Sequence, residues 1–206
     1  VRRTDEGAEA AVRKDAGDDP DVTNGALIAA AIVWTEGNEV EFAAGEGVGT
    51  VTKPGLAIPP GKPAVNPVPQ RMIREAVREV TFRGVRVTIS IDGGRELAAK
   101  TFNPRLGIAG GLSILGTTGI VRPFSCSALR ETLRCALRVA AATGIRAPVF
   151  VPGHIGERAA RSHFRVTPEQ VVEVGNEWGF AIDEAAREPF AALLMVGHPG
   201  KLAKLT

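Results

Sequence analysis

The sequence predicts two folds in succession: an α+β domain with an antiparallel sheet over residues 1–122, then part of a parallel, Rossmann-like α/β domain over residues 123–206. Three observations carry this prediction. Strand-like segments dominate the first part. Beyond Pro123, helical and strand-like segments alternate, which is the order of a parallel sheet. The chain ends shortly after its last predicted strand, so the second domain is expected to be incomplete.

Two strands are expected near the start of the first domain. Residues 26–33 are apolar enough for a buried strand, and residues 39–42 alternate apolar and polar side chains. A hairpin around Gly37-Asn38 is the expected connection between them. Residues 57–69 then carry five prolines, which predict an extended, ordered loop rather than a helix or a central strand.

A short amphipathic helix is predicted over residues 72–80, followed by an alternating strand over residues 85–91. The turn Asp92-Gly93-Gly94 is expected to send the chain back into the antiparallel sheet.

The second domain is expected to open with a helix that Ser127 caps and Gly144 ends. Its apolar positions recur every three or four residues, at Leu129, Leu133, Leu137 and Ala140. Strands are predicted at residues 147–151 and 191–196. Between them we expect three helices: one directly after the first strand, one beginning at Thr167-Pro168 and one over residues 177–188.

Composition excludes several classes of protein. With 44% hydrophobic and 23% charged residues, the chain is globular, and a net charge of only +2 lacks the electrostatic footprint of a nucleic-acid binder. No apolar run approaches the roughly 18 residues that span a bilayer, and the charged start has no signal-peptide core. We therefore expect a cytoplasmic protein without membrane contact. Cys126 and Cys135 lie on different turns of one predicted helix and cannot readily form a disulfide.

Four aspartates crowd a turn between Lys14 and Gly25, and Asp18 and Asp19 are its central candidates for a ligand contact. Carboxylates this close repel one another unless a cation or hydrogen-bond donors face them. A turn of capping aspartates explains the pattern, and so does contact with a metal, a ribose hydroxyl or a sulfonium. Because no His or Cys is near, a zinc site is improbable, and no metal site is predicted.

A glycine-rich loop follows at residues 45–55, and its candidate binding residues are Gly45, Gly47, Gly49, Thr50 and Lys53. Glycines let backbone amides approach an anion or a flat ligand closely. The phosphate-loop pattern requires Lys beside Ser or Thr at the start of a helix, whereas Lys53 precedes Pro54. A purely structural loop is the alternative.

Residues 101–119 are the most unusual segment, with glycines and small hydroxyl residues and little charge. Such a segment suits the wall of a large, partly apolar ligand that bears carboxylates, and Arg105 could hold a carboxylate bidentately. A glycine-rich packing segment with Arg105 on the surface is the alternative. The candidate binding residues are Asn103, Arg105, Gly110, Gly111, Thr117 and Thr118.

Two similar loops, each containing Gly-His, follow the predicted strands of the second domain and contain His154 and His198. If those strands are parallel, both loops emerge at one carboxyl edge, where ligands bind in open α/β sheets. Tight strand-to-helix turns also select glycine for steric reasons, so a purely structural role is the alternative to ligand binding.

Six segments in order resemble the CbiD family, the cobalt-precorrin-5B carbon-1 methyltransferases: KDAGDDPDVTNGA, GEGVGTVTKPGL, VNPVPQRMI, TFNPRLGIAGGLSILGTTGIV, VGNEWGFAIDEA and LLMVGHPGKLAKL. The resemblance implies a methyltransferase with S-adenosylmethionine as co-substrate, a corrinoid substrate, and cobalt only as part of that substrate. Other enzymes of the corrin pathway are candidate partners. Family members extend further at both ends, so both domains are expected to be incomplete and the chain alone to be poorly soluble or partly unfolded.

The resemblance transfers no catalytic residue, and the sequence assigns neither the donor nor the macrocycle to a particular loop. It does not set the oligomeric state. Two other functions stay open: a nucleotide-dependent transferase or hydrolase that uses residues 45–53, and a corrinoid-binding protein of the same pathway that does no chemistry.

Overall fold

The computed structural model describes residues 1–115 and 125–203, which divide into two compact units. Unit 1 comprises Val1–Thr52 and Ala57–Phe124, and unit 2 comprises Lys53–Leu56 and Ser125–Thr206. The domain boundary predicted near residue 122 lies outside the described residues.

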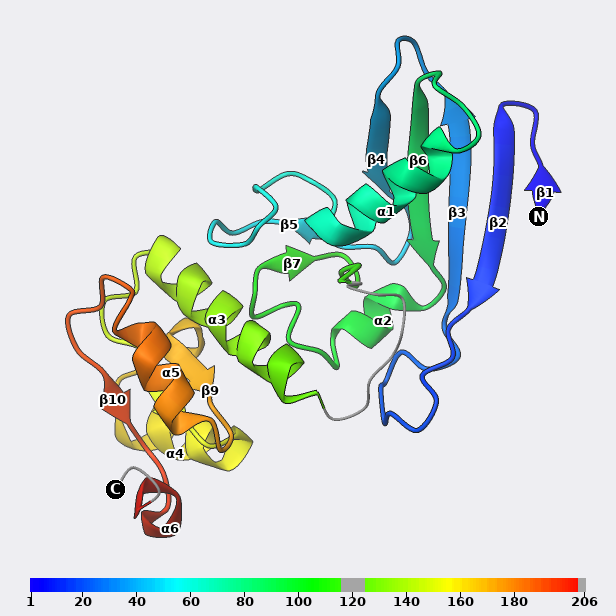
Figure 1. Cartoon of the computed structure of the whole chain (residues 1–206). Coiled ribbons are helices and arrows are strands. Elements are labelled where there is room, and N and C mark those ends of the chain that lie inside the picture. Colours follow the sequence, from blue (N-terminus) through cyan, green and yellow to red (C-terminus); the bar gives the residue numbers. More distant parts are fainter. Residues whose placement is uncertain (116–124, 204–206) are drawn as a thin grey trace. The chain divides into compact units, whose positions relative to one another are not determined.

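Unit 1 is built on a five-stranded sheet in the order β1-β2-β3-β6-β4 (Figure 1). Its strands are β1 (Arg2–Arg3), β2 (Gly7–Arg13), β3 (Leu27–Trp34), β4 (Val40–Ala44) and β6 (Val85–Ile91). Neighbouring strands are antiparallel except β4 and β6, which are parallel. The predicted α+β class with a largely antiparallel sheet is therefore confirmed.

The hairpin predicted around Gly37-Asn38 is wrong, because β6 lies between β3 and β4. The residues between β3 and β4 form a loop that makes two backbone hydrogen bonds with Gly84. The amide of Thr35 donates to the carbonyl of Gly84 at 2.9 Å, and the amide of Gly84 donates to the carbonyl of Gly37 at 2.8 Å. A Cβ on Gly84 would stand 2.7 Å from the Thr35 hydroxyl oxygen. The missing side chain at Gly84 thus lets β6 enter between the other two strands.

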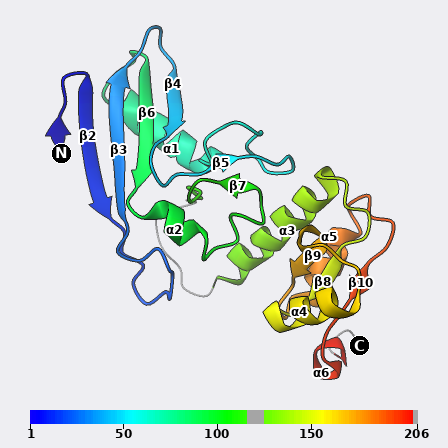
Figure 2. The same ribbon diagram turned by 180° about the vertical axis from the view of Figure 1, so that it is seen from behind.

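Helix α1 (Pro67–Arg78) begins five residues before the predicted start at residue 72. Its first turn contains Pro67 and Pro69, which the sequence analysis assigned to an extended loop. Amides in a first helical turn need no intrahelical acceptor, so proline is tolerated there. The helix places Ile73 and Val77 against the buried face of the sheet, where Val85, Val87, Ile89 and Ile91 of β6 form the centre of the core (Figures 1 and 2).

The turn Asp92-Gly93 leads into the short helix α2 (Gly94–Ala98), not directly back into the sheet. A second, two-stranded sheet follows, in which β5 (Thr50–Val51) pairs antiparallel with β7 (Ile108–Ala109).

Unit 2 opens with helix α3 (Cys126–Ala142), which has the expected apolar face: Leu133, Leu137 and Ala140 are buried, while Leu129 is exposed. The cap is Ser125, whose hydroxyl accepts from the amide of Ala128, and not Ser127 as predicted. The two serine hydroxyls are hydrogen-bonded at 2.8 Å, so both lie at the helix start.

A three-stranded parallel sheet in the order β10-β8-β9 completes unit 2, which confirms the predicted parallel pairing. The strands are β8 (Val149–Val151), β9 (Val171–Glu173) and β10 (Leu194–Met195), and the helices are α4 (His154–His163), α5 (Trp178–Ala185) and α6 (Pro199–Leu202). The helix predicted at Thr167-Pro168 is a single 3-10 turn, Pro168–Gln170, that runs into β9. The β-branched residues after this turn form a strand because Val171 and Val172 are buried on opposite faces of the sheet, under the helices.

Helices cover both faces of this sheet (Figure 2). Phe150 and Val172 pack with α3 and α5 on one face, and Val149, Val151 and Val171 pack with Ala160 of α4 on the other. Alternate residues of β8 are therefore buried on opposite sides, as in a doubly wound sheet. None of the described helices is long and apolar enough to cross a membrane.

Candidate functional site

Three glycine-containing segments of unit 1 pass each other in direct backbone contact. The amide of Ile91 donates to Glu46, and that of Leu112 donates to Gly47, at 2.8 and 2.9 Å. A Cβ on Gly47 would stand 2.0 Å from the carbonyl oxygen of Ile91, and one on Gly94 or Gly111 would stand 2.3 or 2.2 Å from that of Gly47. The backbones at this crossing leave no room for a side chain.

Two further glycines of the 45–55 loop, Gly45 and Gly49, are also enclosed by neighbouring atoms, whereas Gly110 is exposed. Cβ atoms on Gly45 and Gly49 would stand 2.1 and 2.4 Å from the side chains of Ser90 and Ile108. Gly110 has a left-handed φ of 84° and no described atom within 4 Å of a Cβ position. Packing inside the protein thus accounts for Gly45, Gly47, Gly49 and Gly111, while Gly110 lies at the surface.

The segment that contains Asn103 and Arg105 is a compact loop held by its own hydrogen bonds. Asn103 is only 8% exposed, and its Oδ1 accepts from the hydroxyl of Ser113 at 3.1 Å. Its carbonyl accepts from the amide of Ile108 at 2.9 Å. Arg105 lies on the exposed side of the loop. A rigid loop therefore presents an arginine at the surface.

Strand pairing brings other candidates to the same loop. Thr50 is paired with Ala109, next to Gly110, and the hydroxyl of Thr52 donates to Gly107 at 2.8 Å. The structure thus gathers Thr50, Asn103, Arg105 and Gly110 in one region of unit 1. The candidates Thr117 and Thr118 lie outside the described residues.

In the aspartate turn, a cation, Lys14, faces one of the carboxylates. The ammonium of Lys14 bonds the carboxylate of Asp21 and the hydroxyl of Thr23. Partial burial would raise the pKa of Asp21, but the hydrogen bonds from Lys14 and Thr23 outweigh it and lower that pKa. Capping therefore explains Asp21, while Asp18 is exposed and Asp19 half-buried in the turn.

Lys53 and the glycine loop fall in different units. Lys53 belongs with unit 2 through the segment Lys53–Leu56, where Gly55 packs on α3: a Cβ there would stand 2.7 Å from the carbonyl oxygen of Arg138. The loop before Lys53 leads into β5 and not into a helix. The phosphate-loop arrangement of glycine loop, lysine and helix is therefore not formed among the described residues.

Both Gly-His loops follow the carboxyl ends of adjacent parallel strands, β8 and β10. His154 is exposed and is the first residue of α4. His198 is exposed and caps α6, where its Nδ1 accepts from the amide of Gly200 at 3.2 Å. The topology therefore brings these two loops to one edge of the sheet.

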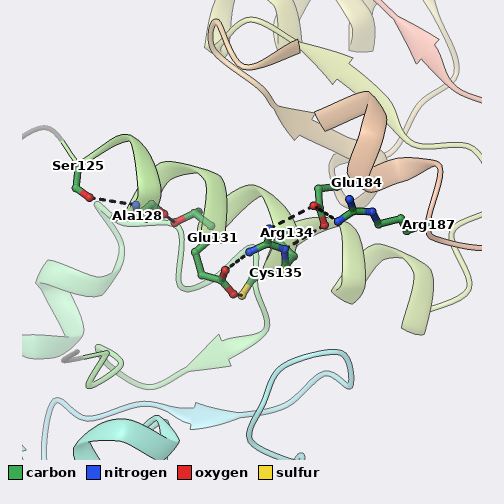
Figure 3. A network of polar contacts seen from close by, with 8 residues as sticks. Ser125, Ala128, Glu131, Arg134, Cys135, Glu184 and Arg187 are labelled. Carbon is green, nitrogen blue, oxygen red and sulfur yellow. Dashed lines mark hydrogen bonds and ion pairs between the residues drawn. The ribbon is translucent and has the colours of Figure 1, made fainter. Parts of the chain in front are cut away.

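A network of charged side chains that the sequence analysis did not identify joins α3 to α5 (Figure 3). The carboxylate of Glu184 bonds Arg134 at 3.0 Å and Arg187 at 2.6 Å, and Arg134 also bonds Glu131. The hydrogen bond from Arg134, with the positive charges around it, lowers the pKa of Glu184. The guanidinium of Arg134 lies 5.4 Å from the ring centre of Phe180.

Cys135 lies beside the same network and is a free thiol, as is Cys126. Burial, reinforced by the charge of Glu131, raises the pKa of the Cys135 thiol. A thiol with a raised pKa is a poor nucleophile, so Cys135 is not a candidate catalytic nucleophile. In the part of the chain that the structure covers, no group of three or more His, Cys, Asp or Glu residues is arranged to hold a metal ion.

Comparison with known proteins identifies relatives for the whole chain. The CbiD family model matches residues 1–123. The chain is 67% identical over 205 residues to a cobalt-precorrin-5B C(1)-methyltransferase of Syntrophotalea carbinolica, covering 100% of this chain and 58% of that protein. It is 46% identical over 207 residues to the protein of the same name from Alkaliphilus metalliredigens, covering 100% of this chain and 55% of that one.

Among solved structures, the chain is similar to the crystal structure of a cobalamin biosynthesis protein (cbiD) from Archaeoglobus fulgidus. That match has 36% sequence identity and a TM-score of 0.45, and it covers 94% of this chain and 61% of the other. The chain thus spans somewhat more than half the length of the curated relatives that it matches.

Proposed function

Because this chain belongs to the CbiD family, we propose that the natural protein carrying this sequence methylates carbon 1 of cobalt-precorrin-5B with S-adenosylmethionine. The observation that carries the proposal is the 67% identity, across 205 residues, to a protein named for that reaction. The matched 205 residues extend over both units.

The chemistry proposed is a displacement at the methyl group. Carbon 1 of the ring forms a bond to the methyl carbon while the bond from that carbon to sulfur breaks, and S-adenosylhomocysteine leaves. Such a reaction requires the protein to align nucleophile and sulfonium and to exclude water, and it requires no acid–base pair at the methyl group.

We assign the corrinoid contact in unit 1 to the loop that holds Asn103, Arg105 and Gly110. This loop, which is held by its own hydrogen bonds, exposes Arg105 and Gly110 beside the half-buried Thr50, which suits a large ring with carboxylate side chains. The glycine candidates Gly47, Gly49 and Gly111 have a weaker claim, since neighbouring atoms of the protein leave no room beside them.

The reaction is tested by anaerobic incubation of the natural protein with cobalt-precorrin-5B and S-adenosylmethionine that carries a ¹³C-labelled methyl group. We expect transfer of one labelled methyl group to carbon 1, located by NMR. A labelled product at another carbon, or no transfer by a folded protein that binds both ligands, contradicts the proposal.

Arg105→Ala tests the corrinoid contact, and Arg95→Ala, an exposed arginine of α2, is its matched control. At sub-saturating corrinoid, we expect Arg105→Ala to lower turnover by about ten- to hundredfold, because a charge-assisted pair is lost. Binding of S-adenosylhomocysteine should not change. Equal losses in both variants would remove Arg105 from the site.

Two other functions have distinct signatures. A nucleotide-dependent enzyme is disfavoured because the 45–49 loop leads into a strand and Lys53 belongs to unit 2. A corrinoid-binding protein without chemistry would bind the macrocycle and have no affinity for S-adenosylhomocysteine. The proposed reaction belongs in the cytoplasm, where free thiols such as Cys126 and Cys135 stay reduced. Enzymes that make its substrate or use its product are the partners proposed.

A further inference from the structure

In the sheet of unit 2, successive strands are added first on one side of β8 and then on the other. From β8 the chain passes through α4 to β9 on one side of β8, and then through α5 to β10 on the other side. The cores show that α4 covers one face of the sheet and α5 the opposite face. In doubly wound sheets, ligands bind at the carboxyl ends of the strands where the order reverses. In unit 2 that point lies between the loops after β8 and β10.

We propose that this edge of unit 2 binds the adenosine part of S-adenosylmethionine, with Glu173 accepting from the ribose hydroxyls. The proposal rests on the proposed function and adds to it the place of the methyl donor. It gives the donor to unit 2, whereas the corrinoid contact proposed above belongs to unit 1.

The turn after β8 has the glycine pattern that close approach of a nucleoside requires. Gly153 has no described atom within 4 Å of a Cβ position, so the edge beside it is open. Gly156, in the first turn of α4, is closed: a Cβ there would stand 2.7 and 3.1 Å from Pro152 and Val151. One glycine thus leaves space for a ligand, and the other lets the helix pack tightly on the strand, as in dinucleotide-binding turns.

Glu173 stands where such folds place the carboxylate that holds a ribose. It is the last residue of β9, the strand beside β8, about 20 residues after the glycine turn. Alternation along β9 puts it on the same face as Val171, which α4 covers. Glu173 has an interaction within the chain, and a carboxylate has acceptor positions for further donors.

A buried indole beside the third loop points to a further polar contact. Trp178 is 1% exposed, and its Nε1 has no hydrogen-bond partner among the described residues. A Cβ on Gly197 would stand 3.6 Å from Cζ2 of Trp178, which is on the nitrogen side of the ring. The unpaired donor therefore lies next to the loop after β10, and a buried donor is costly to leave without an acceptor.

The charges at this edge select among nucleoside ligands. Glu173 ends β9, and Glu157, 9% exposed, lies in the first turn of α4. Lys201 is bonded to Asn176 at 2.8 Å. Glu157 forms an ion pair with Arg161 at 3.8 Å. The carboxylate of Glu173 disfavours a phosphate and suits a ligand with hydroxyl donors. The edge therefore fits the methyl donor better than a nucleoside phosphate.

The test measures binding of S-adenosylhomocysteine to the natural protein by calorimetry, with Glu173→Gln as the first variant. We expect about ten- to hundredfold weaker binding, because a carboxylate acceptor becomes an amide. The 2′,3′-dideoxy analogue of S-adenosylhomocysteine should bind the variant and the unchanged protein within about twofold of each other, since it has no hydroxyl to lose. Glu169→Gln is the matched control, because Glu169 is exposed and precedes β9, at the opposite edge of the sheet.

His154→Trp is a second variant that keeps the test valid if Glu173→Gln does not fold. His154 is exposed and is the first residue of α4, directly after the turn that follows β8, so a larger side chain should be accommodated there while it occupies the edge. Binding of S-adenosylhomocysteine should weaken at least about tenfold, and binding of the corrinoid should not change.

The outcomes separate this inference from the proposed function. If the unchanged protein methylates the corrinoid but both folded variants bind S-adenosylhomocysteine normally, the donor site is elsewhere and the proposed function stands. If the unchanged protein neither binds S-adenosylhomocysteine nor transfers a methyl group, the proposed function fails and the inference fails with it.

Discussion

The glycine crossing of unit 1 and the strand ends of unit 2 use glycine in opposite ways. In unit 1, Gly47, Gly94 and Gly111 bring backbones into direct contact, and a Cβ on any of them would stand within 2.3 Å of a carbonyl oxygen. In unit 2, Gly153 and Gly175 follow strands at the carboxyl edge, and neither has a described atom within 4 Å of a Cβ position. Glycine therefore allows close backbone packing at the crossing and leaves open space at these two strand ends.

This difference matters for assigning function. Glycine runs are commonly taken as ligand-binding loops, and the run at residues 45–49 has that composition. The space beside its glycines, however, is already filled by the protein's own atoms, whereas the space beside Gly153 and Gly175 of unit 2 is free. The distance from a glycine to the nearest other chain segment distinguishes a packing role from an open position better than the number of glycines in the segment does.

The largest expected effect is that of Gly47→Ala. Its φ of 74° is a conformation that alanine rarely adopts, and the new Cβ would overlap the carbonyl oxygen of Ile91. Strain and overlap together should lower the free energy of unfolding by roughly 3 kcal/mol or more. Chemical denaturation of the natural protein measures this. A loss below about 1 kcal/mol would show that the crossing can open, and the contrast between the units would fail.

The second-largest effect is expected in unit 2, where an ion pair between Arg134 and Glu184 joins α3 to α5. Because Arg134 lowers the pKa of Glu184, the folded state holds the ionised carboxylate more strongly than the unfolded chain does. This stabilisation is present above the ordinary glutamate pKa and is lost as the pH falls through the lowered value. The melting temperature of Glu184→Gln should therefore lie below that of the unchanged protein near neutral pH, and the two should converge in acid.

Glu188→Gln is the control for this measurement, because it removes the charge of another glutamate in the same region of the chain. A difference between Glu184→Gln and the unchanged protein that stays constant from neutral to acid pH would mean that the network does not depend on the carboxylate charge.

Gly175→Ala should have a smaller effect than Gly47→Ala, although both positions have a left-handed φ. At Gly175 the φ is 58° and no described atom opposes the new methyl group, so only the backbone preference is lost. We expect a loss of about 1 kcal/mol in the free energy of unfolding. Losses of equal size in the two variants would show that backbone conformation, and not contact, sets the cost.

Ser125→Ala should have the smallest effect of the four. It removes the hydroxyl that caps α3, and the hydrogen bond to the amide of Ala128 is long, at 3.3 Å. The expected loss is about 0.5 kcal/mol, at the low end for caps. Ser127→Ala is the matched control, because Ser127 was the predicted cap. If Ser127→Ala costs more, the cap at the start of α3 is misassigned.

Features encoded within one segment were predictable from the residues alone. The alternation of residues 85–91, the apolar face of α3 and the parallel order of β8 and β10 all follow from local periodicity and element order. The family resemblance was also readable, since it rests on contiguous strings.

Features that depend on a distant segment were not predictable. The position of β6 between β3 and β4 depends on Gly84 fitting into the loop after β3, and the extended form of β9 depends on burial between β8 and two layers of helices. The same holds for the use of each glycine. Whether Gly47 or Gly153 can face a ligand is set by what lies within a few ångströms, and those neighbours are brought there by folding, not by the adjacent residues.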